Sequence, residues 1–256
     1  MDFRLSDVQL ALRDTVVSYC RDHADLATVA DREGRPADGA AWAELAQIGV
    51  LGLLAAEDGD EDGGGAVEAA IAFEQLGRHL CTGPLLWTAI AAPLIPGAAT
   101  GERRVTGIQV DAAAPGPVVV EHALESDVLL LLHDDRVEQC ATADLPDPLP
   151  GEPLDPLTPT AVYESLPAGT VIGGPREAAR LRLAGTVLSA AMLVGLAQGA
   201  LDAASDYALQ RHQFGVPIGS FQAVKHLLAD MYVRTSLARS AAYAAAAVLD
   251  NPRAGE

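Results

Sequence analysis

The strongest constraint on the fold is the segment 211–231, RHQFGVPIGSFQAVKHLLADM, because it joins two helical stretches through a short turn. A long run with apolar helical periodicity ends at residues 210–212. Gly215 and Pro217 then interrupt any helix, and Ser220 stands where its hydroxyl could cap the next one. The segment therefore predicts a helical hairpin.

The same turn carries groups that suit an anion. Backbone N–H groups at the start of the second helix carry partial positive charge, and Arg211 adds a forked guanidinium that matches phosphate oxygens. The alternative is a purely structural turn, in which Phe214 and Phe221 pack into a core. The residues of the turn leave both interpretations open.

Apolar patterning divides the chain into three parts. Residues 1–100 have helical periodicity, beginning with a run after Ser6 that places Val8, Leu12, Val16 and Tyr19 on one face. Residues 101–173 hold short apolar runs at 105–110, 117–124, 127–133 and 160–166, with the lengths expected of strands. Helical patterning returns in residues 174–256. We predict a mainly α protein with a small β domain between an N-terminal helical domain and a C-terminal helical bundle.

One segment has the length of a membrane span. Residues 183–201, LAGTVLSAAMLVGLAQGAL, contain no charged side chain across 19 positions, close to the roughly 20 that cross a bilayer. The segment is rich in Ala and Gly, however, and runs on into the amphipathic stretch 202–210. Gly195 and Gly199 would let another helix approach closely. We interpret it as a bundle helix and predict no membrane span.

The charge balance argues against a nucleic-acid partner. Seventeen Lys and Arg face 35 Asp and Glu, for a net charge of −18, whereas nucleic-acid binding needs a basic face. Basic groups gather locally around the turn, at Arg211, His212, Lys225, His226 and Arg234. An anionic small molecule therefore remains compatible with the sequence.

The cysteines and the N-terminus indicate the compartment. Only three cysteines occur, Cys20, Cys81 and Cys140, without metal-ligand spacing, which is typical of a reducing compartment. Charges in MDFRLSDVQLALRD stand where a signal peptide needs its apolar core. We expect a cytoplasmic protein.

No metal site is predicted. Residues 58–63, DGDEDG, match the opening of a calcium loop, but Ala69 occupies the twelfth position, where a bidentate Glu is required. His122 and His133 have no third ligand at useful spacing.

The turn segment RHQFGVPIGSFQAVKHLLADM closely resembles the signature turn of the acyl-CoA dehydrogenase family, in which an Arg, a Phe-Gly pair and a Phe-Gln or His-Gln pair occupy these spacings. The resemblance continues through residues 195–211 and, more weakly, through 41–53 and 70–78. It implies an α-domain, a β-domain and a C-terminal helical bundle, here apparently shortened. It also implies FAD as cofactor and α,β-desaturation of an acyl-CoA thioester.

The resemblance also implies which residues contact the cofactor. In this family the signature turn of one subunit reaches the ADP half of the FAD that is bound mainly by its neighbour. By position, Arg211 would meet the pyrophosphate, Gln213 and Phe214 would flank it, and Ile218 and Gln222 would line the adenosine side. These five residues are the predicted cofactor contacts.

The chain departs from the family pattern where the catalytic base is expected. Family members carry a catalytic Glu either on the helix before the turn, which corresponds to Gly185 here, or in a loop that would lie beyond Glu256. Residues 106–117, TGIQVDAAAPGP, also lack the usual flavin-ring contacts. No catalytic residue is therefore assigned.

Three hypotheses follow. The first is a subunit that contributes the turn to FAD while a homologous partner in a heterotetramer supplies the base, with a substrate that could be steroid-derived. The second is a complete, self-sufficient acyl-CoA dehydrogenase, homo-oligomeric and seen as a truncated chain. The third is a non-enzymatic helical scaffold subunit.

Overall fold

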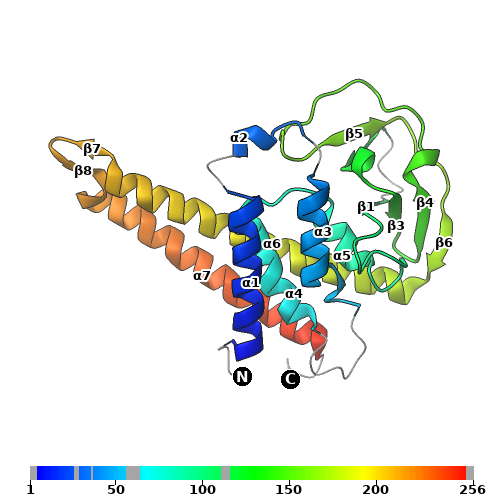
Figure 1. Cartoon of the computed structure of the whole chain (residues 1–256), viewed down its shortest axis with the longest axis horizontal. Coiled ribbons are helices and arrows are strands. Elements are labelled where there is room, and N and C mark those ends of the chain that lie inside the picture. Colours follow the sequence, from blue (N-terminus) through cyan, green and yellow to red (C-terminus); the bar gives the residue numbers. More distant parts are fainter. Residues whose placement is uncertain (1–4, 26–28, 36, 56–63, 111–115, 252–256) are drawn as a thin grey trace. The chain divides into compact units, whose positions relative to one another are not determined.

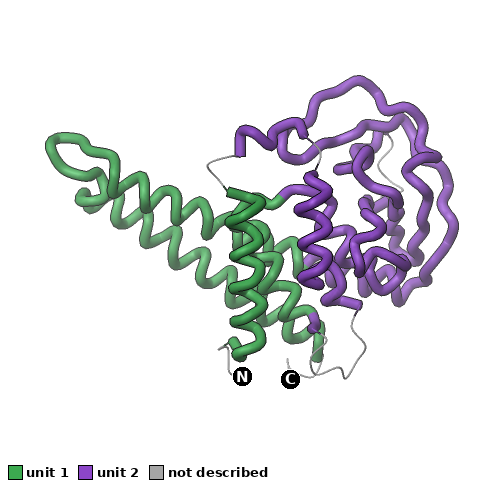
Figure 2. The backbone as a smooth tube through the Cα atoms, in the orientation of Figure 1, with its two compact units in different colours: residues 1–26, 66–81, 187–256 green, residues 27–65, 82–186 purple. Residues whose placement is uncertain are grey.

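The computed structural model describes residues 5–25, 29–35, 37–55, 64–110 and 116–251 (Figure 1). Contacts between residues group the chain into two compact units (Figure 2). Unit 1 comprises residues 1–26, 66–81 and 187–256, and unit 2 comprises residues 27–65 and 82–186. Helices dominate and strands form a smaller part, which confirms the predicted fold class. The predicted boundaries at 100 and 173 fall elsewhere than those of these units and stay a prediction.

Unit 1 consists of long helices and a small hairpin between two of them. Its elements are α1 (Asp7–His23), α4 (Ala66–Arg78), the part of α6 (Pro175–Gln210) from Val187 onward, β7 (His212–Gln213), β8 (Val216–Pro217), η5 (Ile218–Ser220) and α7 (Gln222–Asp250). Within this unit the joined ends of α6 and α7 extend beyond α1 and α4 (Figure 2). The predicted helical hairpin is confirmed.

Helix α1 begins as the sequence predicts. The Ser6 hydroxyl accepts a hydrogen bond from the Gln9 backbone N–H at 3.2 Å, and the Gln9 side chain accepts one from the Ser6 N–H at 2.9 Å. This reciprocal capping box satisfies two N–H groups that no helical carbonyl reaches. Val16 and Tyr19 are buried as expected, whereas Val8, in the first turn, is 66% exposed.

Helices α4 and α6 pack with their backbones in contact. A Cβ atom on Gly195 would collide with the backbone carbonyl of Glu74, and one on Gly199 would lie 2.6 Å from the carbonyl of Arg78. From the other side, a Cβ atom on Gly77 would collide with the carbonyl of Met192. The glycine pair predicted to allow close approach of another helix therefore does so, and α4 is that helix.

Helix α7 is held to α4 mainly by polar groups. Only Thr235, Ala242 and Ala246 are buried among its described residues. At its C-terminal end the Asp250 carboxylate accepts hydrogen bonds from the backbone N–H groups of Ala66 and Val67, at 2.6 and 3.0 Å. A residue 184 positions away thus caps the start of α4 and favours its positive end.

Unit 2 is built around a mixed sheet. Its elements are α2 (Val29–Arg32), α3 (Gly39–Ile48), η2 (Val50–Gly52), α5 (Leu85–Ala91), β1 (Val105–Gln109), β2 (Val118–Glu121), η3 (Ala123–Glu125), β3 (Val128–Leu132), β4 (Val137–Ala141), η4 (Thr142–Asp144), β5 (Thr160–Tyr163), β6 (Thr170–Gly173) and the first part of α6. The larger sheet has the order β1-β3-β4-β6, with β1 and β3 parallel and the other neighbours antiparallel. Strands β2 and β5 form a separate antiparallel pair.

The two sheets of unit 2 confirm the four predicted strands and contain two more. β3 is buried at every residue and packs into a core with Val120, Ala161 and Tyr163. Strands β4 and β6 were not predicted, because VEQCA and TVIG have neither a continuous apolar run nor a clean alternation. β4 instead carries a buried carboxylate, Glu138, which accepts hydrogen bonds from Arg136 and from the Gly169 N–H.

Among the described residues, α6 alone is long and apolar enough to cross a membrane by length and composition. A third of its most apolar window is buried inside the protein. A bundle helix can have the same composition, and the backbone contact with α4 accounts for Gly195 and Gly199 within this run.

The α4–α6 contact predicts opposite outcomes for two glycines of one helix. Gly195→Ala places a methyl group against the Glu74 backbone, which cannot rotate away, at a cost of about 1–3 kcal/mol or more. Gly185→Ala meets only Ile90 Cδ1 at 3.6 Å, and gains up to about 1 kcal/mol of helix propensity. Thermal unfolding should show Tm lowered by several degrees for the first variant only. Equal Tm values for the two variants would contradict the contact.

Candidate functional site

The turn between α6 and α7 is a tight hairpin with an aromatic residue at its tip. Gln213 pairs with Val216, which leaves Phe214 and Gly215 as a two-residue loop with φ values of +53° and +82°. Positive φ at both positions is the geometry of a type I′ turn. Gly adopts it freely, whereas Phe does so at a cost. The Ile218 N–H donates to the Arg211 carbonyl at 2.8 Å and closes the base of the turn.

The five predicted cofactor contacts lie together on this turn, and most of them face solvent. Arg211, Gln213, Phe214 and Gln222 are exposed, and Ile218 is half-buried. Phe214 is 93% exposed. Among the described residues, no hydrogen bond or ion pair holds the guanidinium of Arg211. The turn thus presents an available cation beside an aromatic ring.

The purely structural interpretation of the turn is not supported. Phe214 and Phe221 contact each other edge to face, with ring centroids 6.2 Å apart, but both are exposed. They do not pack the turn into a core. The aromatic pair instead forms an apolar patch at the tip of the hairpin.

The expected role of Ser220 is wrong. Its hydroxyl donates to the Pro217 carbonyl at 2.7 Å, because the 3-10 turn Ile218–Ser220 places that carbonyl nearest. Helix α7 begins one residue later, with Phe221 as a cap that offers no side-chain hydrogen bond. Its first internal bond runs from the Lys225 N–H to the Phe221 carbonyl. The N–H groups of residues 222–224 therefore lack a helical acceptor.

The helices that carry the turn expose a large apolar surface. On the unit 1 part of α6 and on α7, the exposed large apolar side chains are Leu193, Leu196, Tyr207, Leu209, Leu227, Tyr232, Val233, Leu237 and Val248. Scattered apolar residues are normal on a protein surface, but so many on two adjacent helices are typical of an interaction surface.

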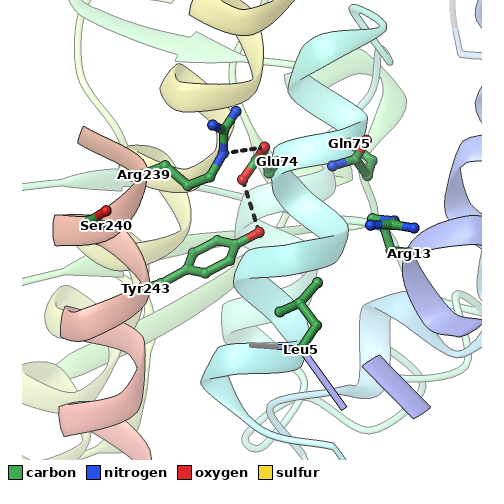
Figure 3. A pocket seen from close by; sticks show the side chains of 7 residues that line it. All are labelled: Leu5, Arg13, Glu74, Gln75, Arg239, Ser240 and Tyr243. Atoms are coloured by element: carbon green, nitrogen blue, oxygen red, sulfur yellow. Dashed lines mark hydrogen bonds and ion pairs between the residues drawn. The ribbon is translucent and has the colours of Figure 1, made fainter. Parts of the chain in front are cut away.

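A second candidate site is a pocket in unit 1 that sequence reasoning missed (Figure 3). Its volume is about 420 Å³, and its lining residues are Leu5, Arg13, Glu74, Gln75, Arg239, Ser240 and Tyr243. Glu74 is only 4% exposed. One of its carboxylate oxygens accepts from Arg239 Nε and the other from the Tyr243 hydroxyl, both at 2.9 Å. The only signal in the sequence is that Glu74 directly follows the apolar run AIAF at residues 70–73.

The pocket's polar groups bind one another. Arg239 also donates to Gln198 at 2.8 Å, and Gln198 donates to Asp202, which pairs with Arg78 at 2.7 Å. Burial, followed by the nearby Glu74 charge, raises the pKa of Tyr243 far above its ordinary value, so its hydroxyl stays protonated as a donor. With both carboxylate oxygens engaged, Glu74 is suited to holding α7 on α4 rather than to accepting a proton from a substrate.

The position expected for a catalytic base on α6 has no side chain. Gly185 is half-buried, and its nearest neighbour for an added Cβ is Ile90. In the described ranges, no group of three His, Cys, Asp or Glu residues is arranged to hold a metal ion. His122 and His133 instead lie near Glu125 and Glu138, at 3.3 and 3.6 Å. The calcium-loop-like residues 58–63 lie outside the described residues.

Comparison with known proteins places this architecture in one class. A model of the acyl-CoA dehydrogenase N-terminal domain matches residues 6–104, and a model of the acyl-CoA dehydrogenase C-terminal domain matches residues 163–255. The chain therefore belongs to the acyl-CoA dehydrogenase family, a family of oxidoreductases. The resemblance noted from the turn is confirmed.

One curated relative and two solved structures illustrate the similarity. The chain is 31% identical over 234 residues to acyl-CoA dehydrogenase IpdE2 of Mycobacterium tuberculosis, an alignment that covers 90% of this chain and 72% of IpdE2. A chain of the ChsE4–ChsE5 complex from Mycobacterium tuberculosis shares the fold with a TM-score of 0.76 and 22% identity, over 98% of this chain and 80% of that chain. A chain of a variant of the Tcur3481–Tcur3483 steroid ACAD (acyl-CoA dehydrogenase) shares the fold with a TM-score of 0.76 and 23% identity. The alignment covers 95% of this chain and 78% of that chain.

The two arginine pairs of α7 predict unequal stabilities. Arg239→Met leaves the buried Glu74 carboxylate without its cation and should cost about 2–4 kcal/mol, since unpaired buried charges are costly. Arg234→Met, the same change on the same helix, removes only an exposed pair with Asp230 and should cost under about 0.5 kcal/mol. Denaturant unfolding of both variants measures the difference. Equal losses of unfolding free energy in the two variants would mean that the Glu74–Arg239 pair does not hold α7.

Proposed function

We propose that this chain is a subunit of an FAD-dependent acyl-CoA dehydrogenase complex, to which it contributes the α6–α7 turn, while a homologous partner supplies the catalytic base. The observation that carries the proposal is an exposed turn whose Arg211 guanidinium is available, in a chain with Gly185 at the base position. The turn offers a binding group, and the α6 position expected for the proton acceptor is a glycine.

The turn fits the phosphate part of a dinucleotide. Arg211 is exposed at the end of α6, and the N–H groups of residues 222–224 are unused at the start of α7. A guanidinium fork and helix N-terminal donors suit a pyrophosphate, because both supply hydrogen bonds aided by positive charge. Phe214 would lie beside it, and Ile218 and Gln222 would face the adenosine side.

The chemistry of the complex divides between subunits. When bound, FAD supplies the acceptor for the hydride that leaves Cβ of the acyl-CoA, while a carboxylate takes the Cα proton. This chain would hold the cofactor's phosphates through Arg211 and exclude water from them with Phe214 and Phe221. The proton would pass to a carboxylate of the partner.

The exposed apolar residues of α6 and α7 support a partner of the same fold. Tyr207, Leu209, Leu227, Tyr232 and Leu237 would be buried by a second pair of helices. The similarity to ChsE4–ChsE5, described as a complex, and to a steroid ACAD supports a heterotetramer with a steroid-derived acyl-CoA substrate. Cytoplasmic localisation is part of the same proposal.

Co-expression tests the division of labour. The chain should purify without full flavin when expressed alone, and the complex with a homologous full-length partner should carry FAD that acyl-CoA bleaches. Full FAD occupancy and turnover by the lone chain would favour the self-sufficient enzyme instead. Absence of flavin from both preparations would favour the scaffold hypothesis.

Arg211 gives the sharpest test of the turn. Arg211→Ala should weaken FAD retention in the complex about 10- to 100-fold, because a charge-assisted bidentate contact contributes about 1.5–3 kcal/mol. FAD retention by Arg211→Lys should lie between that of the unchanged chain and that of Arg211→Ala, because an ammonium group cannot make the bidentate contact of a guanidinium. Arg180→Ala, an exposed arginine on the same helix, is the matched control and should leave retention unchanged. Equal FAD release by the Arg211 and Arg180 variants would remove the turn from the cofactor site.

A further inference from the structure

Two cysteines that lie 61 residues apart in the sequence meet in unit 1. Cys20 is in the last turn of α1, and Cys81 follows the end of α4 by three residues. Their sulfur atoms are 3.5 Å apart. We infer that Cys20 and Cys81 form a modification site at which a peroxide converts the two thiols into a reversible disulfide.

The backbone around both sulfurs is fixed by hydrogen bonds. The Cys81 N–H donates to the Leu76 carbonyl at 3.0 Å, and the Leu80 N–H donates to the Gly77 carbonyl at 3.2 Å. With φ of +53° at Leu80, these bonds form the Schellman motif that ends α4. On α1, the Ala24 N–H donates to the Cys20 carbonyl at 2.8 Å. Side-chain rotation is therefore the main movement needed to reach the S–S bond length of about 2.05 Å.

The two thiols differ in access, which assigns their roles. Cys81 is half-buried and reachable by a small oxidant, whereas Cys20 has no exposed surface. Cys81 would be oxidised first, and Cys20 would then react with the oxidised Cys81 sulfur. Because the thiolate is the form of a cysteine that attacks a peroxide, we expect oxidation to be faster as pH rises.

The reaction balances with peroxide as the only co-reactant. The Cys81 thiolate attacks one peroxide oxygen, the O–O bond breaks, and one water leaves once a proton is taken up, which gives a sulfenic acid. The Cys20 sulfur then attacks the Cys81 sulfur, the S–O bond breaks, and a second water leaves. Two thiols are oxidised and one peroxide is reduced to two waters. A dithiol reductant restores both cysteines by exchange.

The bond would have a measurable effect on the fold. It would join the end of α1 to the end of α4 and close a loop between residues 20 and 81. A loop of this length loses much entropy in the unfolded chain, so the oxidised form should unfold at a higher temperature. This inference is independent of the proposed cofactor role, since it concerns neither the turn nor FAD.

The experiment uses the full chain with Cys140→Ser. This change removes the remaining cysteine, which lies on β4. After hydrogen peroxide treatment and alkylation of remaining thiols, peptide mass spectrometry should find Cys20 joined to Cys81. The Tm should rise by about 5 °C or more and return after dithiothreitol. Adding Cys81→Ser should abolish both the link and the shift.

Three outcomes would overturn the inference. The first is oxidation of Cys81 to a sulfinic acid without a link to Cys20. The second is a link only between two molecules, seen as a dimer on a non-reducing gel. The third is full alkylation of both cysteines after an exposure that oxidises glutathione completely. Because Cys81→Ser changes a half-buried residue, its unoxidised Tm serves as the check that it folds.

Discussion

The contact between the backbones of α4 and α6 is the constraint on which the rest of unit 1 depends. Gly77, Gly195 and Gly199 remove every side chain that would separate the two helices. At this close approach, Glu74 and Arg78 of α4 come within reach of polar groups on α6 and α7. Larger residues at the glycines would push the helices apart and break these contacts together. The charged network is therefore a consequence of the glycine packing.

Helix α7 is only partly packed against the rest of unit 1. It buries few apolar residues and is attached by the Glu74 pair in its second half and by Asp250 at its end. Toward the turn, its apolar side chains, such as Leu227 and Tyr232, face solvent instead. A helix of this kind gains most of its stability from packing, so half of α7 lacks the contacts that a long helix normally has. A second pair of helices on this face would supply them.

The sequence predicted what depends on local pattern and missed what depends on distant partners. Helical periodicity, strand length and the glycine pair fixed the hairpin, four strands and the close helix contact correctly. Ser220 was misjudged because a neighbouring carbonyl competed for its hydroxyl. The Glu74–Arg239 pair and the Cys20–Cys81 pair join residues 165 and 61 positions apart, and no local pattern encodes such meetings. The roles of the turn residues still rest on family resemblance.

Phe214 links the shape of the turn to the division of labour between subunits. A non-glycine residue at positive φ costs about 1 kcal/mol or more, and such strain persists where something compensates for it. Within the chain the compensation is small, because Phe214 contacts Phe221 but remains 93% exposed. A Gly or Asn at this position would form the same turn without strain. The aromatic side chain is therefore explained better by a contact outside the chain than by the stability of the turn. Together with Gly185 at the α6 position where a base is expected, this is the feature of the turn that the proposed role beside a partner subunit would explain.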